Sequence, residues 1–157
     1  MRLEHFFIAV PAALCVLGHS AAIAGKTADG VGALACVTDK WTEKEVEKGH
    51  KLADWVGPCV AVPDDPAAPK YTEDCTVKYE YMPDESWKGN GTCTFTFPGG
   101  DKVYDTVEEG SHLKESVYKI TGGTGKYQGA SGGGTYSCQN LTDTLCGGRY
   151  NGKLELP

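Results

Sequence analysis

Apolar and polar residues alternate with a period of two along much of this chain, as they do in half-buried β-strands. In residues 75–81 every second position is a cysteine, valine or tyrosine, and the positions between them are polar. A second alternating run covers residues 87–97, and turn-forming residues around Asp84 separate the two runs. Folded about Asp84, the runs predict an antiparallel hairpin with two opposed pairs, Tyr81 with Trp87 and Cys75 with Cys93.

Two further hairpins bring cysteines together in the same way. One turns at Thr142 and the other near residues 47–48. Residues 42–52 also fit a short helix, which is the alternative to the second of these turns. Directly opposed cysteines in an antiparallel pair have a Cα separation that a disulfide accepts. The registers therefore predict three disulfides: Cys36–Cys59, Cys75–Cys93 and Cys138–Cys146.

A fourth hairpin joins residues 102–109 to residues 113–120 through a turn at residues 110–111. Its predicted cross-strand pairs are Val103 with Val117, Asp105 with Glu115, and Val107 with Leu113. Four hairpins make eight strands, so the predicted fold class is all-β. Eight antiparallel strands joined in order favour a single up-and-down barrel stapled by disulfides, because closure removes exposed edges. An open two-sheet sandwich is the alternative.

Composition and charge narrow the function. Fifteen Lys and Arg stand against 21 Asp and Glu, giving a net charge of −6. This balance argues against nucleic-acid binding and against a polybasic membrane-surface protein. Hydrophobic residues make up 40% of the chain, which is enough for a packed core.

The first 24 residues predict a secretory signal peptide. An apolar run from Phe6 to Leu17 is too short to span a bilayer, and Ala22-Ile23-Ala24 matches a cleavage site. An uncleaved N-terminal anchor is the alternative. We therefore expect a signal peptide at residues 1–24 and a barrel domain at residues 25–157, secreted or periplasmic and with no membrane insertion after cleavage.

Cysteine usage supports export. Cys15 lies in the predicted signal peptide, which leaves six cysteines, an even number that favours disulfides in an oxidising compartment. No C-x-x-C motif occurs, and only His50 and His112 remain after cleavage, so no metal site is expected. We expect no cofactor.

Glycines dominate residues 120–136, which read ITGGTGKYQGASGGGTY. Tyr follows Lys126, so the run lacks the phosphate-binding P-loop pattern. Glycine permits positive φ and close backbone approach, which favours a tight corner between two strands. Tyr127 and Ala130 are predicted to hold this corner on the core.

The element GGTGKYQGASG at residues 122–132 resembles the G-G-T-G-x-[FY]-x-G-A-x-G element of the allene oxide cyclase and dirigent-like barrels. Small secreted bacterial proteins of this superfamily resemble the chain most. The resemblance covers about residues 100–137 and implies an eight-stranded calycin-like antiparallel barrel. The element is architectural, and no catalytic residue of the family maps onto this sequence.

Asp105 and Glu115 are the candidate catalytic residues. If their face lines the barrel, two carboxyls in an apolar cavity interact and one pKa rises, which suits acid–base chemistry. In the alternative, this face is outside and Tyr104, Tyr118 and Ile120 form the core. His50 and His112 lie among charged residues and are expected in solvent. The chain has no G-x-S-x-G motif, which argues against a serine hydrolase.

An aromatic set is the candidate ligand-binding surface, with core packing as the alternative. Its members are Tyr79, Tyr81, Trp87, Phe95 and Phe97. The favoured function is an exported, non-enzymatic barrel that binds a small apolar ligand. An isomerase or cyclase-like enzyme and a filled structural barrel are the alternatives. A titratable group inside a cavity favours the enzyme, and the absence of a cavity favours the structural protein.

Overall fold

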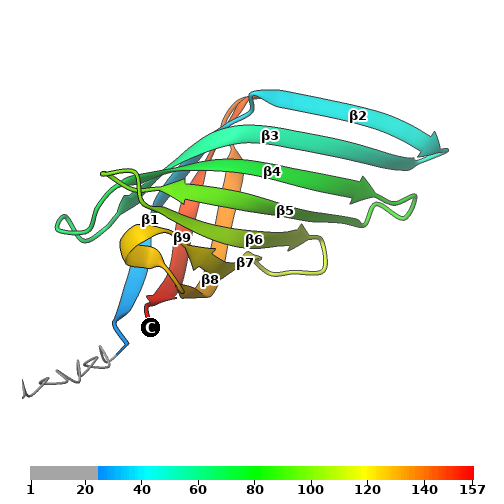
Figure 1. Ribbon diagram of the computed structural model, residues 1–157. Helices are drawn as coiled ribbons and strands as arrows, with labels where there is room; N and C mark the ends of the chain where they lie inside the picture. Colours follow the sequence, from blue (N-terminus) through cyan, green and yellow to red (C-terminus); the bar gives the residue numbers. More distant parts are fainter. Residues whose placement is uncertain (1–24) are drawn as a thin grey trace, which may run out of the picture.

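The computed structural model describes residues 25–157, so the predicted signal peptide lies outside the described residues. The chain forms nine β-strands and one 3-10 turn (Figure 1). Their bounds are β1 Thr27–Val37, β2 Lys40–Glu47, β3 His50–Pro63, β4 Tyr71–Tyr81, β5 Trp87–Thr96, β6 Lys102–Gly110, β7 Ser116–Gly123, η1 Gly125–Tyr127, β8 Ser131–Asn140 and β9 Leu145–Glu155. Within residues 25–157 no helix is long and apolar enough to cross a membrane.

Eight of the strands close into an antiparallel barrel, which confirms the predicted fold class. The strand order is β1-β9-β8-β7-β6-β5-β4-β3-β2, and an additional pairing of β1 with β3 closes the barrel. The ninth strand, β2, lies at the edge beside β3 (Figure 1). β3 has 14 residues, so its first half pairs with β2 and its last residues pair with β1. Residues 42–52, for which a short helix was the alternative, belong to the β2–β3 hairpin.

The three predicted disulfides are confirmed. Cα–Cα separations are 4.0 Å for Cys36–Cys59, 4.1 Å for Cys75–Cys93 and 5.6 Å for Cys138–Cys146. The β4–β5 register is the predicted one, with Cys75 opposite Cys93. Cys36 and Cys59 are also directly opposed. Their disulfide links β1 to β3 where the barrel closes and does not bridge a hairpin, because β2 lies between these two strands in the sequence.

Cys138 and Cys146 are bonded but not directly opposed, so that predicted register was wrong. Cys138 pairs with Gly148, and Cys146 pairs with Asn140. The turn is therefore centred one residue beyond Thr142. The disulfide spans the diagonal between the two pairs, at a Cα separation within the usual range.

The predicted β6–β7 register was also wrong. Asp105 pairs with Ile120, and Glu115 lies exposed in a turn before β7. The predicted pairs centre the turn on residue 110, whereas residues 111–115 separate the strands. A bulge between Tyr104 and Asp105 adds a further register shift.

The glycine-rich element forms the predicted corner, and it joins β7 to β8 through η1. Tyr127 and Ala130 are buried, and the Tyr127 ring lies 4.4 Å from that of Phe97. Gly125 has φ +55°, and a Cβ there would meet Asp101 Oδ1 at 1.9 Å. A side chain at this position would therefore be strained by the positive φ and would displace the Asp101 carboxyl.

Candidate functional site

The interior of the barrel contains a cavity of about 810 Å³ that opens to solvent. Side chains do not fill the barrel, contrary to the filled-barrel alternative. The wall combines aromatic rings, all six bonded cysteines and several carboxyls. A cavity of this size accommodates a small organic molecule.

Two buried carboxyls lie on the interior face of the barrel. Glu73 comes from β4 and Asp105 from β6, and β5 runs between them. Their exposed fractions are 8% and 3%. Asp105 thus lies inside, as one prediction required, but its acidic neighbour is Glu73 and not Glu115.

Both carboxyls titrate near neutral pH rather than in the usual acidic range. Burial raises the pKa of Asp105 to about 7, and the Cys93 amide, which donates to Asp105 Oδ1 at 2.9 Å, opposes this rise. Burial, and then the charge of Asp105, raise the pKa of Glu73 to about 8. Near neutral pH the site therefore holds both protonated and ionised carboxyl groups, which supply a hydrogen-bond donor and an acceptor.

A third cavity-lining carboxyl, Glu109 at the end of β6, accepts hydrogen bonds from two tyrosines. Tyr79 donates to Oε2 at 2.8 Å, and Tyr136 donates to Oε1. Burial and then the charge of Glu109 raise the pKa of both hydroxyls. These tyrosines stay protonated and hold Glu109 in place.

The predicted aromatic set divides between two ends of the barrel. Tyr79, Tyr81 and Trp87 form one cluster on the cavity wall, with ring centroids 6.0–6.4 Å apart. Phe95 and Phe97 pack around Tyr71, at 5.3 and 4.8 Å. Of the five, only Phe97 does not line this cavity.

A second cavity of about 740 Å³ has Phe97 on its wall. The two cavities share four aromatic side chains, Tyr71, Phe95, Tyr118 and Tyr150. Tyr118 and Ile120 face inward, as the alternative face assignment predicted for them. That assignment was wrong for Tyr104, which is 38% exposed.

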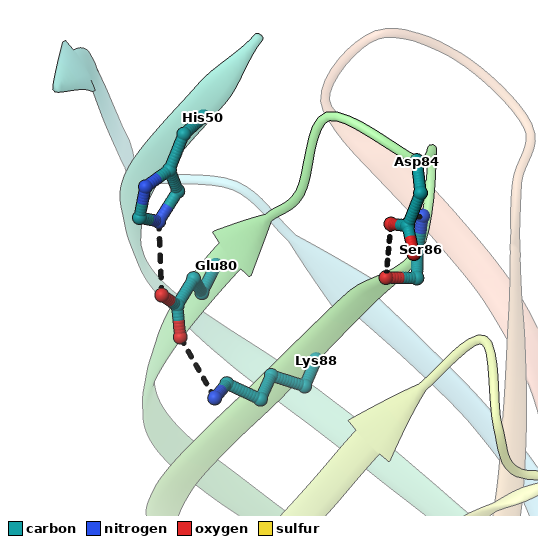
Figure 2. Close-up of polar contacts among 5 residues, drawn as sticks. All are labelled: His50, Glu80, Asp84, Ser86 and Lys88. Carbon is teal, nitrogen blue, oxygen red and sulfur yellow. Dashed lines mark hydrogen bonds and ion pairs between the residues drawn. The ribbon is translucent and has the colours of Figure 1, made fainter. Parts of the chain in front are cut away.

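His50 and His112, the two histidines within residues 25–157, line neither cavity. His50 Nε2 is 2.9 Å from Glu80 Oε1, and Lys88 Nζ is 2.8 Å from Glu80 Oε2 (Figure 2). Lys88 and then His50 hold the pKa of the Glu80 carboxyl below its usual range. Figure 2 also shows Asp84, which accepts from Ser86 in the β4–β5 turn. These contacts stabilise the strand ends on the outside of the barrel.

Clusters that resemble metal-binding groups contain bonded cysteines. One joins Cys36, Cys138 and Cys146, and the other joins Cys59, Glu73 and Cys75. Metals bind cysteine as thiolate, and a disulfide offers none.

Sequence reasoning missed Glu73 and Glu109 as cavity-lining residues. Both continue the inward alternation of their strands. Glu73 stands two residues before Cys75, and Glu109 stands two residues after Val107. Extending each alternation to the strand end would have found them.

Comparisons with known proteins identify the fold. No protein-family model matches the chain, and no curated protein sequence matches it. Among solved structures, the pterocarpan synthase dirigent protein GePTS1 superposes with a TM-score of 0.57 at 12% identity, covering 84% of this chain and 91% of that one. The pterocarpan synthase dirigent protein PsPTS1 superposes with a TM-score of 0.56 at 11% identity, covering 83% and 96%.

The chain has the dirigent-like barrel fold. A protein of unknown function from the DUF3224 family of Shewanella oneidensis shares it, with a TM-score of 0.54 at 9% identity, covering 84% of this chain and 98% of that one. Identities this low establish the fold alone. The resemblance first seen in the glycine-rich element is therefore confirmed at the level of fold.

Proposed function

We propose that this protein is an exported barrel that binds one small, largely aromatic molecule in its main cavity. The observation that carries the proposal is the cavity of about 810 Å³, which has an aromatic cluster and the Glu73–Asp105 pair on its wall. Aromatic walls with a few convergent polar groups are typical of small-molecule sites. Three disulfides support export, because such bonds persist in oxidising compartments.

The charges on the wall restrict the ligand. Five acidic side chains line the cavity, and among the described lining residues there is no lysine, arginine or histidine: Asp39, Glu73, Asp105, Glu109 and Asp143 are the acidic ones. An anionic ligand would meet like charge in a region of low dielectric. The ligand class is therefore a neutral or cationic aromatic molecule with a hydroxyl or amino group that donates to Asp105.

The test compares two probes of one shape, 2-naphthol and 2-naphthoate. All three tryptophans of the chain, Trp41, Trp55 and Trp87, line the cavity, so their fluorescence reports its occupancy. We expect 2-naphthol to reduce the emission and 2-naphthoate to bind at least about tenfold more weakly, a difference of about 1.4 kcal/mol. The protein used is the form that its host exports. Its intact mass is expected to match a chain that begins at Gly25 and contains three disulfides.

A variant pair assigns the discrimination to the site. Asp105→Asn should narrow the difference between the two probes, because it removes a negative charge from the wall. Glu115→Gln removes a charge that lies exposed outside the cavity, and it should change neither affinity. Equal binding of naphthol and naphthoate, or no fluorescence response to either, would contradict the proposal.

A second candidate function is acid–base isomerisation of a bound ketone. The observation that favours it is that two buried carboxyls, Glu73 and Asp105, line one cavity. Their pKa values, raised to about 8 and about 7, allow one carboxyl to hold a proton while the other is ionised near neutral pH. Asp105 would take a proton from the carbon beside the carbonyl, and Glu73 would give its proton to the carbonyl oxygen, producing the enol. Reversal of both transfers returns the ketone.

Deuterium exchange measures this chemistry without a known substrate. We expect the protein to accelerate incorporation of deuterium from D₂O into 2-tetralone, followed by proton NMR. Asp105→Asn should reduce the acceleration by about a hundredfold, the usual contribution of a positioned base. Exchange that is equally fast with Asp105→Asn would eliminate this candidate and leave the binding proposal standing.

A further inference from the structure

Cys36 has two cysteine neighbours on adjacent strands. On one side it is directly opposite Cys59 of β3, and on the other side it is directly opposite Cys146 of β9. Opposed residues of antiparallel strands have Cα atoms about 4.5–5.5 Å apart, which falls within the range that disulfides accept. The backbone therefore allows Cys36 to bond to either neighbour.

The sulfur atoms are close enough for exchange. The Sγ atoms of Cys36, Cys138 and Cys146 all lie within 4.8 Å of one another. The Cys138–Cys146 disulfide therefore lies beside the Cys36–Cys59 disulfide, within 4.8 Å of Cys36 Sγ. Disulfides exchange when a thiolate attacks a neighbouring disulfide sulfur, so freeing one sulfur of the first bond would place a nucleophile beside the second.

The two disulfides differ in exposure. Cys138 is exposed and Cys146 half-buried, whereas Cys36 and Cys59 are 8% and 3% exposed. A thiol from solution reaches the outer bond first. The inner bond is the less exposed of the two, although Cys36 and Cys59 also line the main cavity.

We propose that this protein exchanges disulfides with a small-molecule thiol, and that Cys36 changes its partner from Cys59 to Cys146 during the reaction. The thiolate attacks Cys138 Sγ, forms a mixed disulfide there, and breaks the bond to Cys146, which leaves as a thiolate. Cys146 then attacks Cys36 Sγ, and the Cys36–Cys59 bond breaks with its electron pair on Cys59. This activity goes beyond the binding function proposed above.

The overall exchange balances with two thiols. A second thiol attacks the mixed disulfide and releases Cys138 as a thiol and the two small molecules as their disulfide. The protein gains two electrons and two protons, and it ends with a Cys36–Cys146 bond and thiols at Cys59 and Cys138. The small molecule is oxidised by the same two electrons.

Glu73 is placed to protonate the Cys59 thiolate. One of its carboxylate oxygens lies within 4.8 Å of Cys59 Sγ, and the carboxyl is buried. Its raised pKa, to about 8, keeps a proton available near neutral pH. The new Cys59 thiol would face the main cavity, since Cys59 lines it.

Two double variants with the same number of cysteines test the geometry. Cys59→Ser/Cys138→Ser retains Cys36 and Cys146, and we expect these to bond, leaving no free thiol. Cys36→Ser/Cys138→Ser retains Cys59 and Cys146, whose strands are separated by β1, about two strand spacings or 9.5 Å. It should show two free thiols in the folded state. Two free thiols in the first variant as well would overturn the proposal.

The unaltered chain provides a readout that does not depend on these variants folding. The protein is treated with reduced glutathione, alkylated at low pH and mapped by peptide mass. We expect Cys36–Cys146 to appear together with alkylated Cys59 and with glutathione or alkyl on Cys138. Reduction of Cys138–Cys146 with Cys36–Cys59 left intact, or no reaction at all, would contradict the exchange while leaving the ligand-binding proposal untouched.

Discussion

Glu73→Gln is expected to make the protein more stable than the wild type at pH 8.5. Burial raises the folded-state pKa of Glu73 to about 8, whereas an unfolded glutamate ionises near its ordinary value of 4.5. Between these values the folded chain keeps a proton that the unfolded chain releases, so the free energy of unfolding falls as pH rises. The loss is complete above pH about 8. At about 1.4 kcal/mol for each pKa unit, it is on the order of 3–5 kcal/mol.

Glutamine is neutral at every pH and removes this fall. The measurement is urea unfolding at pH 5.5, 7 and 8.5, without reductant so that the disulfides stay intact. Glu115→Gln is the matched control, because the same change at an exposed turn should leave the pH dependence as in the wild type. If Glu73→Gln kept the full pH dependence, Glu73 would not be the buried protonated acid described above.

Alternation and cysteine position were enough to predict the barrel wall but not every strand pairing. On β4 and β5 the register was correct because two strongly alternating runs flank a turn that is centred on Asp84, where the prediction placed it. On β7 it was wrong, because alternation fixes the face of a strand only when the turn length is known. The turn between β6 and β7 lies further along the chain than predicted, so Asp105 pairs with Ile120 and not with Glu115.

Two parts of the molecule carried no usable signal in the sequence. All residues of β2 are exposed, so its pattern lacks the apolar alternation that marks a strand. The pairing of Glu73 with Asp105 depends on the offset between β4 and β6 across β5, and neither strand alone reveals it. Local pattern therefore predicted which residues face inward, and the registers of adjacent strands determined which of them lie near one another.

Tyr127→Ala is expected to destabilise the protein by about 3–5 kcal/mol, the range for truncating a large buried aromatic side chain. Tyr127 is 6% exposed and its ring lies 4.4 Å from that of Phe97, so truncation opens space between the glycine-rich corner and the core. The corner joins β7 to β8, and loosening it weakens closure at that end of the barrel. Urea unfolding at pH 5.5, where the buried carboxyls are protonated, measures the loss.

Tyr104→Ala provides the matched control on the neighbouring strand β6. Tyr104 is 38% exposed, so the same truncation removes less buried area and should cost clearly less than Tyr127→Ala. A similar loss for both variants would mean that Tyr127 does not anchor the corner. Tyr127→Ala is expected to lose unfolding free energy while it still binds 2-naphthol as the wild type does, measured at urea concentrations below the unfolding transition. This result would assign stability to the glycine-rich corner and ligand recognition to the carboxyl-lined cavity.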